Sequence, residues 1–259
     1  NGNDLIYGNG VDNILDGNDG TDTAIYSNER FNFDVTGNSS SAQVNDNFGS
    51  EGRDSLSNIE RLEFTDYVVN LTVGDAVSSV TPDTLQQLEE LYVAFFNRVP
   101  DADGIEYWIG QFNAGQTINQ IAESFYDVGV QYSDLTGFTA GMTDTDFINV
   151  VYNNVLGRED GPDAEGLAYW TTALESGAES NATLVSSIIA AAHTYKGDAE
   201  WGWVANLLDN KVEVANLFAV EYGLNNLTSE ESISEGMAIA AAITPTDIDA
   251  AIELIGVIV

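Results

Sequence analysis

Residues 2–26 read GNDLIYGNGVDNILDGNDGTDTAIY, and this stretch decides the fold of the N-terminal part of the chain. On a nine-residue ruler, units start at Gly8 and Gly17, and a partial unit ends at Tyr7. The sixth positions are Asp4, Asn13 and Asp22, and the eighth positions are Ile6, Leu15 and Ala24. A short fixed period of this kind indicates a stack of nearly identical turns.

A fourth unit, GSEGRDSLS at residues 49–57, keeps the spacing, with Gly49, Gly52, Asp54 and Leu56 in the matching places. Glycines permit a tight, partly left-handed turn, the aspartate points into that turn, and a short strand buries one aliphatic side chain. Stacked turns form a parallel β-roll whose successive units lie on alternate sides. We therefore expect Asp4 and Asp22 on one side, where they flank a calcium ion that carbonyl oxygens also bind.

Calcium is thus the cofactor that the repeat predicts. The predicted ligands are Asp4, Asp12, Asn13, Asp19, Asp22 and Asp54, with the turn glycines Gly2, Gly8, Gly10, Gly17, Gly20, Gly49 and Gly52. The alternative is that Asn, Asp and Gly form ordinary turns, but the shared register of the units favours calcium. The second turn is expected to be weak or empty because Asn13 replaces an acid and Val11 replaces a glycine.

After these repeats, apolar residues alternate with polar ones over 31–35 and again over 42–44, which predicts a β-hairpin. The stretch TDTAIYSNERFNFDVT (21–36), followed by GRDSLSNIERLEFTD (52–66), resembles the segment that caps the roll of RTX proteins. These proteins carry hemolysin-type calcium-binding nonapeptide repeats. The resemblance covers nearly all of residues 1–74, and it implies a protein exported by type I secretion.

Beyond residue 79 the apolar period changes from two to 3.6, and Thr81-Pro82 reads as a helix start. After a first helix with an apolar stripe from Leu85 to Val99, further helices are predicted at 104–113, 117–131, 144–156, 164–176, 181–195, 199–222, 229–243 and 245–256. The predicted fold class is therefore mixed. A short parallel β-roll with a β-rich cap (1–77) precedes an all-helical domain (81–259).

The helical part contains an internal duplication. LYVAFFNRVPDADGIEYW (91–108) aligns with VYNNVLGREDGPDAEGLAYW (151–170) if two residues are inserted before Pro162. We place the first repeat at about 83–135, the second at about 143–196 and the C-terminal helices at 199–259. Residues 85–196 resemble an uncharacterised helical family often found beside RTX repeats and distantly similar to phycobilisome linker repeats. That resemblance implies a fold but little about function.

Composition excludes several functions. The chain has 42 acidic and seven basic residues, a net charge of −35, one histidine and no cysteine. Nucleic acid is not expected as a partner, because phosphate binding needs clustered Lys and Arg. Cysteine chemistry and a two-histidine zinc motif are excluded, and His193, at the end of an apolar helix, is expected to be structural. No run is long and apolar enough to span a membrane, and we expect a protein that is not an enzyme.

Other candidate sites have ordinary explanations that we favour. Asp101, Asp103 and Glu106 in one loop, and Asp163 and Glu165 in its repeat, are weaker metal candidates, but helix capping explains acids at these positions. Arg98 and Arg158 are expected to clamp a carboxylate or a helix end within the chain. The aromatic pairs 107–108 and 169–170 fit helix packing better than sugar stacking.

The predicted function is that of a calcium-dependent structural or adhesive surface protein, such as a surface-layer, filament or adhesin component. We expect it to be extracellular, secreted or attached to the cell surface, and to associate with itself or other surface components through calcium. Surface polysaccharide remains an alternative partner. The alternative function is a C-terminal secretion and folding module of a larger secreted hydrolase, since the sequence begins in mid-motif at Asn1. The apolar run at 252–259 fits either an export signal or a last core helix.

Overall fold

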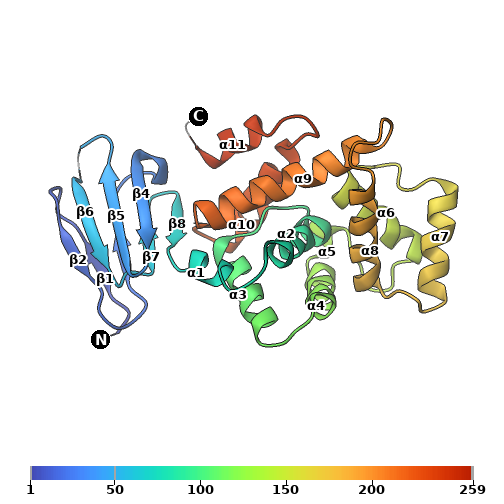
Figure 1. Cartoon of the computed structure of the whole chain (residues 1–259), viewed down its shortest axis with the longest axis horizontal. Helices are drawn as coiled ribbons and strands as arrows, with labels where there is room; N and C mark the ends of the chain where they lie inside the picture. Colours follow the sequence, from blue (N-terminus) through green and yellow to red (C-terminus); the bar gives the residue numbers. More distant parts are fainter. Residues whose placement is uncertain (1, 50, 258–259) are drawn as a thin grey trace.

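A computed structural model describes residues 2–49 and 51–257 of the chain. Its N-terminal part consists of two β-sheets, and the rest is predominantly helical (Figure 1). The predicted arrangement of a β-roll with a β-rich cap followed by helices is therefore confirmed. Asn1 and the last two residues of the apolar C-terminal run lie outside the described residues.

The nine-residue units alternate between the two sheets, as predicted. Strand β1 (Leu5–Tyr7) pairs in parallel with β3 (Thr23–Ile25), so that Ile6 lies opposite Ala24. Strand β2 (Ile14–Asp16) pairs in parallel with β6 (Arg53–Ser57) in the other sheet, where Leu15 lies opposite Leu56. Every eighth position of the repeat thus meets the eighth position of the unit stacked on it.

The cap consists of the predicted hairpin and two further strands. Strands β4 (Phe33–Asn38) and β5 (Ser41–Asp46) pair antiparallel, and β5 continues onto β6. In the other sheet, β7 (Arg61–Glu63) pairs in parallel with β3, and β8 (Tyr67–Asn70) runs antiparallel to β7. Buried side chains of both sheets, among them Ala24, Val44, Leu56 and Leu62, belong to one hydrophobic cluster. Apolar burial of this kind holds the short strands together.

The duplicated helices follow. After α1 (Val73–Val77), the first repeat forms α2 (Pro82–Phe96), α3 (Ala102–Asn113), α4 (Ile118–Gln131) and α5 (Ser133–Thr136), and the second forms α6 (Asp144–Leu156), α7 (Ala164–Glu175) and α8 (Asn181–Thr194). Pro82 opens α2, and the Thr81 hydroxyl accepts the Thr84 N–H. Helices α4 and α8 begin at equivalent capping boxes, on Thr117 and Ser180. Both repeats bury their apolar faces in one cluster.

The C-terminal segment contains the three predicted helices and, in addition, a short strand that was not predicted. Helix α9 (Gly202–Asn216) ends in a π-helical turn, Leu217–Glu221, and strand β9 (Leu224–Asn226) then pairs antiparallel with β8. Helices α10 (Ser229–Ala242) and α11 (Asp249–Ile255) follow. Phe218, Leu224 and Ile239 share the hydrophobic cluster of the β-sheets. The end of the chain thus joins the two parts into one packed unit.

Candidate functional site

Buried aspartates connect the stacked turns on both sides of the roll. Asp22 is 0% exposed, and its Oδ1 accepts the backbone N–H of Asp4 at 2.8 Å. On the other side Asp54 is 1% exposed and accepts the N–H of Asn13, also at 2.8 Å. The structure therefore brings together the sixth positions of units stacked on each other: Asp4 with Asp22, and Asn13 with Asp54.

The second oxygen of Asp22 has no partner. Its Oδ2 is buried and makes no hydrogen bond within the residues that the structure describes. A Cβ added to Gly17 would lie 2.5 Å from this oxygen and 2.1 Å from the carbonyl oxygen of Asn58. Two oxygens thus converge where only a glycine fits. A buried carboxylate oxygen without a donor is costly unless a cation or a proton satisfies it.

Asp54 lies in a turn like that of Asp22, but both of its carboxylate oxygens accept hydrogen bonds. Its Oδ2 accepts the Tyr26 hydroxyl at 3.2 Å, and a Cβ on Gly8 would lie 3.4 Å from this atom and 3.0 Å from Asn13 Oδ1. Burial raises the pKa of the Asp54 carboxyl, and the hydrogen bonds from Asn13 and Tyr26 oppose that shift. This side offers the amide of Asn13 where the other side offers the carboxylate of Asp4.

The remaining predicted ligands lie in the same stacked turns. The Gly2 N–H donates to the Asp19 carbonyl at 3.0 Å, and a Cβ on Gly20 would lie 2.2 Å from the Gly2 carbonyl oxygen. Asp12 Oδ1 accepts the Arg53 N–H at 2.9 Å, and Gly52 packs against the backbone of Val11 and Asp12. Gly10 and Gly49 have positive φ angles, as left-handed turns require.

A cation in these loops would need backbone oxygens as well as carboxylates as ligands. Within residues 2–49 and 51–257, no group of three or more His, Cys, Asp or Glu side chains is arranged to hold a metal. Carboxylates alone therefore do not make up a site in these loops, and carbonyl oxygens would have to supply much of the shell. Calcium accepts such mixed shells of carboxylate and carbonyl oxygens.

Sequence reasoning missed Glu60. Its Oε2 accepts the backbone N–H of Asp22 at 2.8 Å, which repeats the bond between Asp22 and Asp4 one unit further on. The nine-residue ruler did not indicate this role because Glu60 follows Asp54 by only six residues. Asn58, with φ of 52°, makes the shortened turn in place of a glycine. The sequence signal for this turn was the asparagine itself, because Asn adopts positive φ more readily than most residues other than glycine.

The carboxylates of the acidic loop at the start of α3 bind to other side chains of the same chain. Asp103 forms an ion pair with Arg61 at 2.9 Å, and Glu106 accepts hydrogen bonds from Asn70 and Thr72. Asp101 stands at the N-cap position of α3, but its carboxylate bonds to Arg98 at 3.2 Å instead of capping the helix. In the second repeat Asp163 does cap α7, through the Gly166 N–H, and Glu165 lies exposed in the first turn of that helix.

Each helical repeat also forms a pocket from equivalent residues. The two pockets have volumes of about 470 and 310 Å³, which lie in the range of small-molecule sites. The paired lining residues are Tyr92 and Tyr152, Phe96 and Leu156, Arg98 and Arg158, Asp101 and Asp163, Gly104 and Gly166, Trp108 and Trp170, and Tyr132 and Tyr195. We call them the first and the second pocket.

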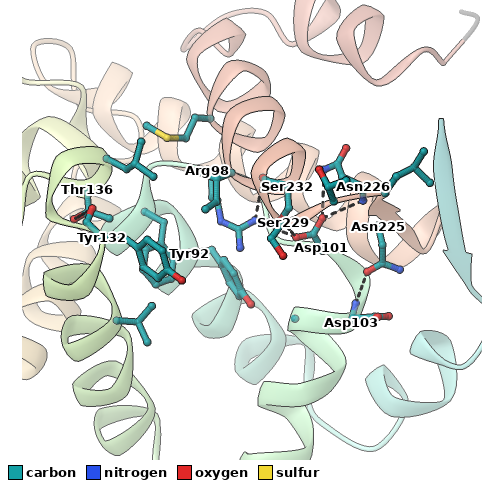
Figure 2. A pocket seen from close by; sticks show the side chains of 18 of the residues that line it. Tyr92, Arg98, Asp101, Asp103, Tyr132, Thr136, Asn225, Asn226, Ser229 and Ser232 are labelled. Atoms are coloured by element: carbon teal, nitrogen blue, oxygen red, sulfur yellow. Dashed lines mark hydrogen bonds and ion pairs between the residues drawn. The ribbon is translucent and has the colours of Figure 1, made fainter.

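The arginines of the two pockets differ in their partners. Arg98 Nη1 bonds to the Asp101 carboxylate and, at 3.1 Å, to the Ser232 hydroxyl of α10, as Figure 2 shows. The expectation of an internal clamp is therefore confirmed for Arg98. Among the described residues, the Arg158 guanidinium has no ion pair and no hydrogen bond, and its carbon lies 4.5 Å from the centre of the Trp201 ring. Asp163 follows Arg158 by five residues, where Asp101 follows Arg98 by three, and its carboxylate accepts the Gly166 N–H instead.

The His193 side chain lies beside carboxylates of two other helices. Its Nε2 lies 2.7 Å from Glu90 Oε1, and its Nδ1 lies 3.8 Å from Asp209. The hydrogen bond to Glu90 raises the pKa of the imidazole, while partial burial opposes that shift. Its partners are thus carboxylates of α2 and α9, and the histidine links three helices.

Part of the chain matches a known protein family. Residues 135–194 match a family described as a domain of unknown function (DUF4214), a range that holds α6, α7 and α8. No curated protein and no solved structure matches the chain. The matched range contains most residues of the second pocket.

Proposed function

We propose that this chain is a calcium-dependent, non-catalytic structural or adhesive protein of the extracellular surface, with calcium bound between the stacked turns of the β-roll. The observation that carries the proposal is the buried, unpartnered Oδ2 of Asp22, which lies beside the Gly17 turn and the Asn58 carbonyl. A calcium ion there would satisfy this oxygen and be completed by carbonyl oxygens of the glycine turns.

The charge of the chain supports the same proposal. A net charge of −35 opposes compaction, and bound divalent cations reduce that repulsion. Extracellular calcium modules bind with Kd values of about 10⁻⁴ to 10⁻³ M, so such a roll stays open at low calcium and closes in calcium-rich medium. Binding energy then becomes folding energy of the N-terminal part.

The roll also offers a surface for association with other surface components. Leu5, Tyr7 and Ile14 on its outermost strands β1 and β2 are exposed, and neither strand has a neighbour on its outer side among the described residues. Unpaired strands invite pairing with another chain. No helix of the described residues is long and apolar enough to cross a membrane.

The test is calcium titration of the full chain by isothermal calorimetry, with Asp22→Asn as the variant. The amide keeps an oxygen for the Asp4 N–H but removes the charge, so calcium affinity should fall at least tenfold. The matched control is Asp34→Asn on β4, which removes the same charge from an exposed position outside the turns. Equal calcium affinity of both variants and the unaltered chain would refute the proposed site.

A further inference from the structure

The second pocket has a polar group with no partner and rings that are open to solvent. The Arg158 guanidinium is half-buried and lies against Trp201, with its carbon 5.5 Å from the centre of the Tyr152 ring. Tyr169 and Tyr195 also line this pocket and are 66% and 42% exposed. An arginine fork held flat on aromatic rings keeps its N–H groups free for a planar anion.

The first pocket shows what satisfies the equivalent arginine. Arg98 donates to one carboxylate oxygen, from Asp101, and to one hydroxyl, from Ser232, and it also lies within hydrogen-bond distance of the carbonyl oxygens of Val99 and Ser232. All these groups come from the chain itself, and α10 and the residues before it line that pocket. The second pocket has no counterpart of α10 among its lining residues. A carboxylate with a nearby hydroxyl therefore has to come from outside if Arg158 is to gain the same partners.

The other polar groups of the second pocket further restrict the chemical class of the ligand. Asp163 and Glu165 line the pocket and are exposed, and ionised carboxylates only accept hydrogen bonds. A ligand must offset their repulsion of its own carboxylate by donating several hydroxyl groups to them. The exposed tyrosine rings provide an apolar face with a polar edge, on which a ring with axial C–H groups packs.

We propose that the second pocket binds an acidic sugar, with the uronic carboxylate on Arg158, the ring against Tyr169 and Tyr195, and hydroxyls donated to Asp163 and Glu165. The volume of about 310 Å³ is enough for one sugar ring with part of a second. This site goes beyond the calcium role and does not depend on it, because α6 to α9 form the pocket without the turns of the roll.

The test is binding of digalacturonic acid to the full chain at constant millimolar calcium, by calorimetry and by tryptophan fluorescence, to which Trp170 and Trp201 of the pocket contribute. We expect the disaccharide to bind, and its neutral counterpart galactobiose to bind at least tenfold more weakly. Arg158→Gln should weaken binding of the acid by about 10- to 100-fold, because a charge-assisted hydrogen-bonded pair is lost. Tyr169→Ala should also weaken it, whereas Tyr107→Ala, the matched change in the first repeat, should not. Tyr107 is exposed but lies outside both pockets.

Three results would overturn the assignment. The first is no binding of digalacturonic acid to the unaltered chain. The second is equal binding by the Arg158→Gln variant, which would indicate calcium bridging to the acidic surface and not the pocket. The third is equal affinity for galactobiose or for triglutamate, which would assign the pocket to neutral sugars or acidic peptides.

Discussion

Asp22 Oδ1 accepts the backbone N–H of Asp4 at 2.8 Å, and Asp54 Oδ1 accepts that of Asn13 at the same distance on the opposite side of the roll. The same bond therefore occurs in both stacks of turns. It fixes each aspartate in the turn and leaves its second oxygen directed elsewhere, toward Tyr26 for Asp54 and toward no described partner for Asp22. The predicted calcium site rests on this difference.

Gly17→Ala tests how closely the turns are packed. The new Cβ would lie 2.1 Å from the Asn58 carbonyl oxygen and 2.5 Å from Asp22 Oδ2, so the turns have to separate. We expect a loss of about 1–3 kcal/mol in the free energy of unfolding, measured by urea denaturation at constant calcium. Gly110→Ala is the control, because nothing lies within 4 Å of its added Cβ in α3, and it should stabilise the chain by about 0.5–1 kcal/mol. Equal effects of the two changes would show that the turns are loosely packed.

The same arginine substitution should lower the free energy of unfolding by different amounts in the two repeats. Arg98→Gln removes the ion pair with Asp101, whose side chain is only 16% exposed, and the bond to Ser232 of α10, while Asp101 keeps hydrogen bonds from Ser232 and Asn226. We expect a loss of about 1–3 kcal/mol in unfolding free energy. Arg158→Gln removes only contacts with aromatic rings and should cost about 0.5–1 kcal/mol. Urea denaturation of both variants measures the difference, and a larger loss for Arg158→Gln would contradict the assigned partners.

The buried carboxyl of Glu89 should make the stability of the folded chain depend on pH. This carboxyl is 1% exposed, and burial raises its pKa to about 8, with only a hydrogen bond from Asn216 to oppose the shift. Between the ordinary glutamate pKa of about 4.3 and 8, the folded chain holds a proton that the unfolded chain has lost. The contribution of this group to stability is therefore present below pH 4.3 and falls as pH rises, by up to about 1.4 kcal/mol per unit.

Glu89→Gln should remove this slope, because the amide stays neutral and still accepts from Asn216. Relative to the unaltered chain, the variant should gain thermal stability at pH 7.5 and show little change at pH 5. The control is Glu90→Gln, which breaks the pair with His193 and should lower stability at both pH values. A Glu89→Gln variant with the same pH profile as the unaltered chain would show that Glu89 is ionised in the fold.

The elements that could be predicted from the sequence are those determined by residues close together along the chain. The nine-residue register placed units two apart on one side of the roll, where Ile6 lies opposite Ala24, because the period fixes which side chains face inward. The pairing of Leu15 with Leu56 was not predicted, since the period does not say where the later unit at 49–57 stacks. Strand β9 was missed, since three residues, Leu224–Asn226, carry no strand period of their own and pair only because β8 offers an edge. The role of Glu60 was missed because a shortened turn broke the period. The contrast between Arg98 and Arg158 was missed because Ser232 is remote in sequence.

Amide hydrogen exchange with and without calcium tests the central claim most directly. If calcium folds the β-roll, adding millimolar calcium to the chelated chain should slow exchange strongly in peptides covering 2–26 and 49–63, which contain the paired strands β1, β2, β3, β6 and β7. Peptides covering α7 and α8, distant from the turns, should change little. Unchanged exchange in the strand peptides, or protection confined to the helices, would contradict the account.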